Sequence, residues 1–314
     1  MNAGEMSPIV QEWLNELRGS HFTLDAWMLF FRRAWIQARS TAQAHPALTR
    51  SCLRCAAGVA AAQGGALTLE ALVADTRAAK RTAPGALVWM AWASFDCWAH
   101  LGMAQAAHDR SLQHTFGLAN AATLARRGIA GLLIGRLLSG QPASRSYILT
   151  TTVGAIITDC MDGLIARRHQ QTSRLGAYLD SIADLEVWTA MIITLGVTRL
   201  WPTWLTSLAL LRWLAPVAAA ARSYFASSRG VVMGSTRAGR IAGVAQALSV
   251  GLALAPKGCA QRIAGFRTAV YVLTAAQMIA TPLSRAVSVC EARRSGEYSA
   301  HWGLEHTASS ASRR

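Results

Sequence analysis

The second half of the chain alternates long apolar runs with short polar connections. Gly, Pro, Ser and Arg fill the connections, as in "SGQPASR", and no period-2 alternation of the kind found in β-strands occurs. Each apolar run is close to the 20 or so residues that a membrane-spanning helix needs. The runs cover about 118–138, 145–166, 177–198, 203–223, 238–256 and 267–287. The pattern therefore predicts an all-α integral membrane protein built on a bundle of six transmembrane helices.

The first third of the chain has a mixed pattern and predicts an N-terminal helical extension over residues 1–112. Within it, residues 23–39 place four aromatic side chains on one helical face: Trp27, Phe30, Phe31 and Trp35. Such a face is typical of an amphipathic helix at a membrane surface, and equally of a helix that packs its aromatic side chains inward. The sequence leaves both alternatives open.

Residues 84–104 of this extension are long enough to cross a bilayer, but Asp96 and His100 interrupt the apolar run. A span here would also place the N-terminal region opposite the side that the arginines mark as cytoplasmic. The segment either spans the membrane or lies along its surface. Asp96 and His100 are four residues apart, so one helical face would bring them into contact.

The overall composition supports a membrane protein. Hydrophobic residues make up 52% of the 314 residues and charged residues only 15%, whereas soluble domains carry about a quarter charged residues. The formal net charge of +15 predicts an anionic partner. Because the basic residues are spread between the apolar runs and form no continuous stripe, we expect an anionic lipid bilayer and no nucleic acid.

The distribution of arginine predicts how the six segments are oriented in the cell membrane. The loops after the second and fourth segments, together with the polar tail 291–314, hold more arginines than the opposite connections. These loops contain Arg167, Arg168, Arg174, Arg222, Arg229, Arg237 and Arg240. Under the positive-inside rule they lie in the cytoplasm. The membrane domain, 113–290, would then be a multi-pass unit whose acidic cluster faces the cytoplasm.

Acidic residues are rare in this domain and lie almost entirely in one stretch. Four of the five acids between residues 110 and 290 fall within "DCMDGLIARRHQQTSRLGAYLDSIAD", where they are Asp159, Asp162, Asp180 and Asp184. Each carboxylate near hydrocarbon costs roughly 2.5–3.5 kcal/mol on insertion scales. The spacings i, i+3 and i, i+4 put each pair on one helical face. A chain reversal between the pairs would bring four carboxylates together, a ligand set suited to Mg²⁺ or Mn²⁺.

This stretch resembles the signature of the CDP-alcohol phosphatidyltransferase family. The pattern is Asp159-x2-Asp162-Gly163-x2-Ala166-Arg167-x8-Gly176-x3-Asp180-x3-Asp184, with all eight fixed positions present. The resemblance covers roughly residues 115–290 and implies six transmembrane helices. It also implies transfer of a phosphatidyl or related phosphoryl group from a CDP-linked donor, such as CDP-diacylglycerol, to an alcohol, with release of CMP.

The resemblance further assigns roles to the residues of the pattern. Asp159, Asp162 and Asp180 would ligate two divalent ions that bridge the pyrophosphate. Asp184 would act as general base on the acceptor hydroxyl and also touch a metal ion. The donor nucleotide would lie against residues of two segments: Gly163, Ala166, Arg167 and Gly176, with Asn120, Thr123 and Arg126 of an Asn-x2-Thr-x2-Arg sequence upstream.

The acceptor is less well indicated than the donor. Candidate acceptor contacts are Arg212, in the middle of an apolar segment, and the loop arginines Arg222, Arg237 and Arg240. Arg212 would otherwise pair with a carbonyl, and loop arginines are more often only topology signals. The arginine content favours a phosphorylated acceptor such as glycerol 3-phosphate or an inositol phosphate. Arg240 stands where the family often has lysine, and this departure leaves the acceptor open.

Two other functions are compatible with the same residues. An ion or metal transporter would use intramembrane carboxylates, but it usually places them near the bilayer midplane and not at helix ends. A non-catalytic membrane scaffold would not need the intact pattern, and it would tolerate substitution of Asp184. The resemblance also implies a homodimer formed through membrane helices.

Overall fold

The computed structural model describes residues 8–105, 111–141, 143–169, 172–226, 237–255, 266 and 268–274. These residues are almost entirely helical. Gln105 and Leu112 form an isolated antiparallel β-bridge. The all-α class is therefore confirmed. The chain divides into two compact units. The first unit consists of Phe31–Leu210, and the second unit combines Met1–Phe30 with Leu211–Arg314.

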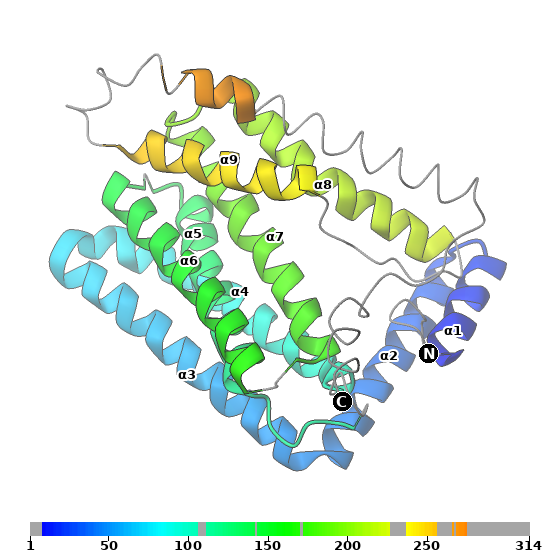
Figure 1. The fold of residues 1–314 in the computed structure, drawn as a ribbon. Coiled ribbons are helices and arrows are strands. Elements are labelled where there is room, and N and C mark those ends of the chain that lie inside the picture. The colour runs from blue at the N-terminus through cyan, green and yellow to red at the C-terminus, as the bar shows by residue number, and fades with distance from the viewer. Residues whose placement is uncertain are drawn as a thin grey trace, which may run out of the picture. The chain divides into compact units, whose positions relative to one another are not determined.

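Figure 1 shows the helices in their order along the chain. Their bounds are α1 Pro8–Gly19, α2 Leu24–Ala44, α3 Pro46–Glu70, α4 Thr76–Ala99, α5 Leu118–Leu138, α6 Arg145–Arg168, α7 Arg174–Val197, α8 Thr203–Ala226 and α9 Arg237–Leu254. The boundary between the two units falls inside α2 and α8.

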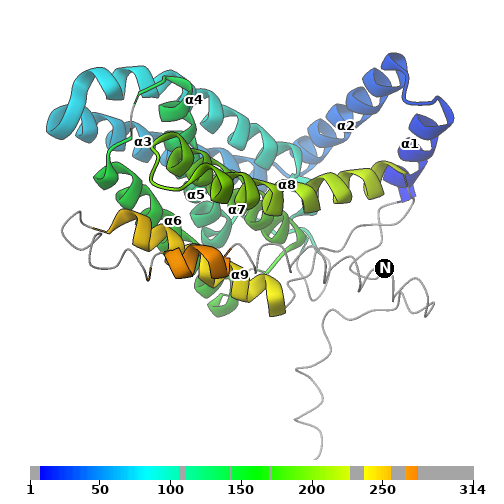
Figure 2. The same cartoon turned by 90° about the horizontal axis from the view of Figure 1, so that it is seen from above.

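Helices α3 and α4 form a hairpin at the start of the first unit (Figures 1 and 2). A π-helical turn, Ala71–Asp75, joins them. The Asp75 carboxylate caps α4 by accepting hydrogen bonds from the backbone N–H groups of Arg77 and Ala78. The hairpin was not predicted, because the alanine- and glycine-rich sequence of α3 has no marked apolar face. Residues 84–99 of the predicted span 84–104 belong to α4.

Helix α5 is the centre of the first unit and packs against α3, α4, α6 and α7. It begins after Gly117, whose φ of 81° is accessible mainly to glycine. Gly131 and Gly135 allow a close approach to α4. An added Cβ at Gly131 would lie 3.3 Å from the carbonyl oxygen of Ala86, and one at Gly135 would lie 2.5 Å from the carbonyl oxygen of Thr82. Small residues at such contacts are typical of helix packing in membranes.

Helices α6 and α7 carry the aspartates, and serine caps fix where both helices begin. The Ser144 hydroxyl accepts a hydrogen bond from the N–H of Tyr147, and the Ser173 hydroxyl accepts one from the N–H of Gly176. Helix α6 ends at Arg168 and α7 begins at Arg174, so the chain reverses within a few residues. This reversal is the one that the aspartate spacing required.

Five of the six predicted spans coincide with α5 to α9, and the sixth is described only at its beginning, where residues 268–274 are helical. By length and hydropathy, three described stretches qualify as membrane spans: Pro46–Ala99, Arg145–Arg168 and Thr203–Arg222. The first is the bent α3–α4 hairpin. Helices α5 and α7 fall outside this set, and both carry several charged residues. The six-helix bundle therefore stays a prediction.

The second unit gathers α1, the start of α2, the end of α8, and α9. Arg18 donates a hydrogen bond to the carbonyl oxygen of Phe225 at 2.7 Å, and Trp27 packs against the Phe225 ring with centroids 5.2 Å apart. Apolar side chains in the α2 part of this unit are exposed, namely Leu24, Met28 and Leu29, and so are Phe31, Trp35 and Ile36 in the α2 part of the first unit. Whether this helix lies at a membrane surface or packs its aromatic side chains inward stays a prediction.

Candidate active site

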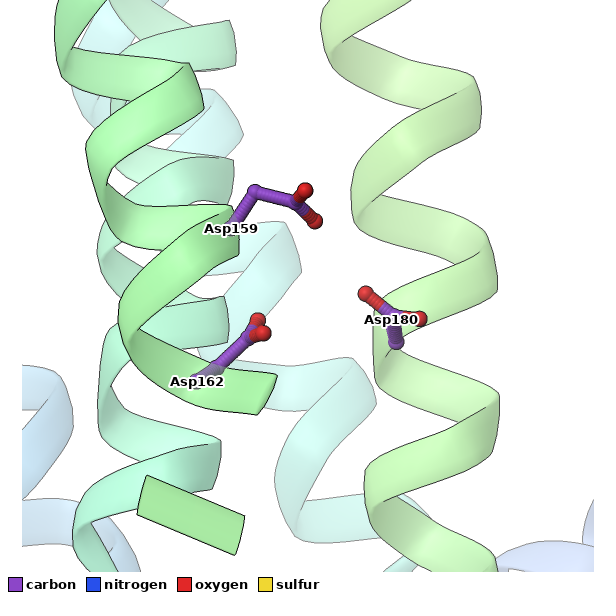
Figure 3. A group of neighbouring side chains, drawn as sticks. All are labelled: Asp159, Asp162 and Asp180. Carbon is purple, nitrogen blue, oxygen red and sulfur yellow. The ribbon is translucent and has the colours of Figure 1, made fainter. Parts of the chain in front are cut away.

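Four aspartates from α6 and α7 face one another in the first unit. Figure 3 shows Asp159 and Asp162 on one helix and Asp180 on the other, with the carboxylates directed toward one another. One carboxylate oxygen from each of these three residues lies within 4.8 Å of the others. Asp162 is the most buried, whereas Asp159 and Asp180 are half exposed. The i, i+3 spacing on α6 and the antiparallel course of α7 produce this convergence.

The guanidinium of Arg126, on α5, is bound by all four aspartates. Its Nη1 donates to Asp159 and, at 2.5 Å, to Asp184; its Nη2 donates to Asp162 and, at 2.7 Å, to Asp180. The Arg126 side chain is only 2% exposed. A planar guanidinium with several fixed donors is suited to such multiple pairing, which a lysine ammonium would not reproduce.

Two more polar residues of α5 line the same cluster. The Thr123 hydroxyl donates to Asp162 Oδ2 at 2.8 Å and is itself buried. Asn120 donates to the carbonyl oxygen of Phe116, and its own side-chain oxygen lies 3.1 Å from where a Cβ on Gly176 would stand. Glycine at position 176 thus lets α7 approach α5. The Asn-x2-Thr-x2-Arg sequence is brought to the aspartates as a whole.

The remaining residues that were predicted to contact the CDP-linked donor lie near the end of α6. Gly163 follows Asp162 directly, and the guanidinium of Arg167 folds back over it, 3.2 Å from where a Cβ on Gly163 would stand. Ala166 is partly buried and Arg167 is exposed. Gly163 and Arg167 therefore lie beside the cluster, and a contact of these residues with a nucleotide stays a prediction.

The predicted acceptor contacts belong to the second unit. Arg212 donates from Nη1 to the side-chain oxygen of the buried Gln246 at 2.6 Å. The accepting atom is the carbonyl oxygen of a side-chain amide, and a role of Arg212 in an acceptor cavity stays a prediction. Arg222 is exposed. Arg237 and Arg240 lie in the first turn of α9, and their side chains are outside the described residues.

A second charged cluster was missed in the sequence. Arg127, next to Arg126, is fully buried and is bound by Asp96 of α4 and Glu186 of α7. The doublet Arg126–Arg127, together with a fifth acid inside the membrane domain, was the available signal. The expected contact between His100 and Asp96 is present, at 3.1 Å from Nδ1 to Oδ1.

Sequence comparison identifies the family to which this arrangement belongs. A sequence model of the CDP-alcohol phosphatidyltransferase family matches residues 116–284, more than half of the chain. This chain is a member of the CDP-alcohol phosphatidyltransferase family. Such proteins are membrane transferases of phospholipid biosynthesis that use CDP-linked lipid donors and alcohol acceptors. The recognition of the aspartate pattern is thereby confirmed.

Individual relatives within the family match over shorter stretches. A CDP-diacylglycerol–glycerol-3-phosphate 3-phosphatidyltransferase of Sodalis glossinidius is 44% identical over 17% of this chain and 28% of its own length. A probable phosphatidylglycerophosphate synthase of Mycobacterium tuberculosis is 31% identical over 44% of this chain and 66% of its own length. A probable cardiolipin synthase (CMP-forming) of Drosophila melanogaster is 42% identical over 18% of both chains.

The chain spans less than two thirds of the length of each of these relatives. No solved structure matches the chain. The comparisons therefore establish the family. The reaction, the donor and the acceptor of this chain have to be argued from its own residues.

The charge of the cluster indicates how metal ions would fit. CDP-alcohol phosphatidyltransferases generally depend on divalent metal ions. The formal charge of four aspartates and one arginine is −3, and the cluster is partly buried. Like charges this close repel one another unless a cation offsets them. Carboxylate oxygens are the ligands that Mg²⁺ and Mn²⁺ prefer. The ligand atoms and the excess negative charge of the cluster therefore both fit divalent ions.

Proposed function

We propose that the protein transfers a phosphatidyl group from CDP-diacylglycerol to glycerol 3-phosphate and releases CMP. The observation that carries the proposal is the convergence of four aspartates from α6 and α7 on one buried arginine of α5. Use of CDP-linked lipid donors in the family supports CDP-diacylglycerol as the donor. One relative is named as a CDP-diacylglycerol–glycerol-3-phosphate 3-phosphatidyltransferase and another as a probable phosphatidylglycerophosphate synthase, and these names support glycerol 3-phosphate as the first acceptor to test.

Asp159, Asp162, Asp180 and Asp184 would hold two divalent ions. When bound, Mg²⁺ or Mn²⁺ supplies positive charge to the pyrophosphate of the donor. The ions would compete with Arg126 for the same carboxylate oxygens. Release of the guanidinium from some of these partners would leave its N–H donors available to a phosphate oxygen. Arg126 would then hold the donor while the aspartates hold the metal.

Asp184 would take the proton of the acceptor. The acceptor hydroxyl oxygen bonds to the phosphorus of the phosphatidyl group, the bond from that phosphorus to the CMP oxygen breaks, and the hydroxyl proton passes to an Asp184 oxygen. CMP leaves with the bridging oxygen. Asp184 is partly exposed. A general base needs this exposure here, because the acceptor and its hydroxyl group reach the site from the aqueous phase. A cytoplasm-facing site lets CMP leave to water while the acyl chains stay in the bilayer.

The test is CMP release by the purified protein in detergent. CDP-diacylglycerol and Mg²⁺ or Mn²⁺ are supplied with glycerol 3-phosphate, inositol, inositol phosphate or serine in turn. We expect release that depends on glycerol 3-phosphate and is abolished by EDTA. Asp184→Asn should lose at least 100-fold in rate, while Asp25→Asn, a change at an exposed acid of α2, should not.

Two outcomes would contradict parts of this proposal. CMP release that depends on a different acceptor would support the transferase activity and would show that glycerol 3-phosphate is not the acceptor. If the Asp184→Asn variant is folded, binds CDP-diacylglycerol and metal, and releases CMP as fast as the wild type, Asp184 is not the general base.

A further inference from the structure

A second buried charge network lies beside the aspartate cluster. Arg127 is fully buried, and its Nη1 donates to Asp96 Oδ2 at 2.6 Å. Its Nε and Nη2 donate to the two oxygens of Glu186 at 2.9 and 2.6 Å. This fork-on-fork pairing fixes the guanidinium plane as well as its position. One arginine of α5 thereby joins α4 on one side and α7 on the other.

Further hydrogen bonds hold both carboxylates in place. The Tyr178 hydroxyl donates to Asp96 Oδ1 at 2.9 Å, and the ring nitrogen of Trp89 lies within donating distance of Glu186 Oε2, at 3.4 Å. His100 also contacts Asp96. A buried network whose members all have partners is rigid and orients each of them.

The network and the aspartate cluster use adjacent positions of the same helices. On α5, Arg127 follows Arg126 directly. On α7, Glu186 is two residues after Asp184, and Tyr178 is two residues before Asp180. A shift of the α5 backbone at Arg127 relative to the α7 backbone at Glu186 would therefore also move Arg126 relative to Asp184.

The α3–α4 hairpin lies before residues 116–284, which the family shares, yet it is closely packed onto α5. Gln63 of α3 donates to the carbonyl oxygen of Gly128 at 2.9 Å. Glu70, at the end of α3, forms an ion pair with the buried Arg136. The hairpin thus supplies a carboxylate to two of the three buried arginines of α5, and removing it would leave Arg136 unpaired.

We propose that the α3–α4 hairpin is part of the catalytic unit and that Asp96 is a positioning residue, which with Glu186 holds Arg127 and thereby sets how Arg126 meets the four aspartates. The role of Asp96 in turnover rests on the proposed transferase function. Its role in organising the carboxylates does not, because metal binding reports on their arrangement in the absence of any reaction.

The test compares three full-length variants in detergent: Asp96→Asn, Asp96→Glu and the control Asp25→Asn. Mn²⁺ affinity is measured by electron paramagnetic resonance, and kcat and KM by CMP release. We expect Asp96→Asn to bind Mn²⁺ at least 5-fold more weakly and to lose at least 10-fold in kcat, with KM for glycerol 3-phosphate within 2-fold. Asp96→Glu keeps the charge and should recover part of both, and the control should match the wild type.

A folded Asp96→Asn protein whose Mn²⁺ affinity and kcat both stay within 2-fold of the wild type would overturn the proposal. If Asp96→Asn does not fold, Tyr178→Phe decides, because it removes a single hydrogen bond to Asp96. A 3-fold or larger loss of kcat or of Mn²⁺ affinity, at unchanged elution volume, supports positioning, and wild-type values oppose it. If the wild type releases no CMP, the transferase proposal fails and the Mn²⁺ titrations still test the role of Asp96.

Discussion

Arg126 and Arg127 are neighbours on α5, yet their guanidinium groups are bound by two separate sets of carboxylates. Arg126 pairs with the four aspartates of the family pattern, and Arg127 pairs with Asp96 and Glu186. Consecutive residues of a helix point about 100° apart. One helix therefore serves the candidate active site on one face and the contact with the N-terminal hairpin on another.

Replacing Arg126 by glutamine should make the protein's stability depend strongly on divalent ions. Without the guanidinium the four carboxylates repel one another, so in EDTA we expect a loss of about 2 kcal/mol, less than a fully buried pair would cost because three of the acids are partly exposed. Divalent ions lose a competitor, so saturating Mn²⁺ should raise the melting temperature more than in the wild type.

The measurement for Arg126→Gln is thermal unfolding in detergent with and without Mn²⁺. Arg168→Gln, a change at an exposed arginine at the end of α6, is the control. An equal Mn²⁺-induced shift in the Arg126→Gln variant and the wild type would show that the guanidinium and the ions do not share the same carboxylates.

Replacing Thr123 by valine should impair the site without disturbing the fold. The substitution keeps the shape but removes the hydroxyl that donates to Asp162, so a partly buried carboxylate loses one of its donors. We expect CMP release to fall about 10-fold, corresponding to about 1.4 kcal/mol, and Thr123→Ser to retain most of it. Thr68→Val, at an exposed position of α3, should leave the rate unchanged. A wild-type rate in Thr123→Val would exclude a role for this hydrogen bond.

Replacing Gly135 by alanine should loosen the hairpin from α5. The new Cβ would stand 2.5 Å from the carbonyl oxygen of Thr82 and 2.7 Å from the backbone nitrogen of Ala86, and neither backbone atom yields easily. We expect a loss of about 1–3 kcal/mol, seen as a lower melting temperature. Gly64→Ala, where an added Cβ meets nothing within 4 Å, should be neutral or slightly stabilising. Equal melting temperatures for the two variants would contradict the tight contact between α4 and α5.

Replacing Glu70 by glutamine should destabilise the protein because it leaves Arg136 as an uncompensated buried charge. Removing one partner of a buried pair typically costs about 3–5 kcal/mol, whereas replacing both partners by apolar residues is often neutral. Thermal unfolding of Glu70→Gln should therefore show a large decrease in melting temperature, and Glu70→Leu/Arg136→Leu should recover most of it. A double variant as unstable as the single one would assign the loss to packing and not to charge.

Some of the fold and of the candidate site was predictable from local patterns. The positions of α5 to α9 follow from apolar runs of spanning length, and the grouping of the aspartates follows from two helical spacings and a short reversal. The α3 helix was not predictable, because its alanine- and glycine-rich sequence gives no apolar periodicity. The part of the sixth predicted span beyond residue 274 lies outside the described residues.

The family, the four carboxylates and the helices that hold them can be recognised from residue types at short fixed spacings. The pairing of the charges could not be recognised in this way, because it depends on the packing of the helices. The tertiary structure placed Arg126 among all four aspartates and joined Asp96 to Arg127 across 31 positions of the chain. Pairing at that separation depends on how α4, α5 and α7 pack together, and no local spacing specifies that packing.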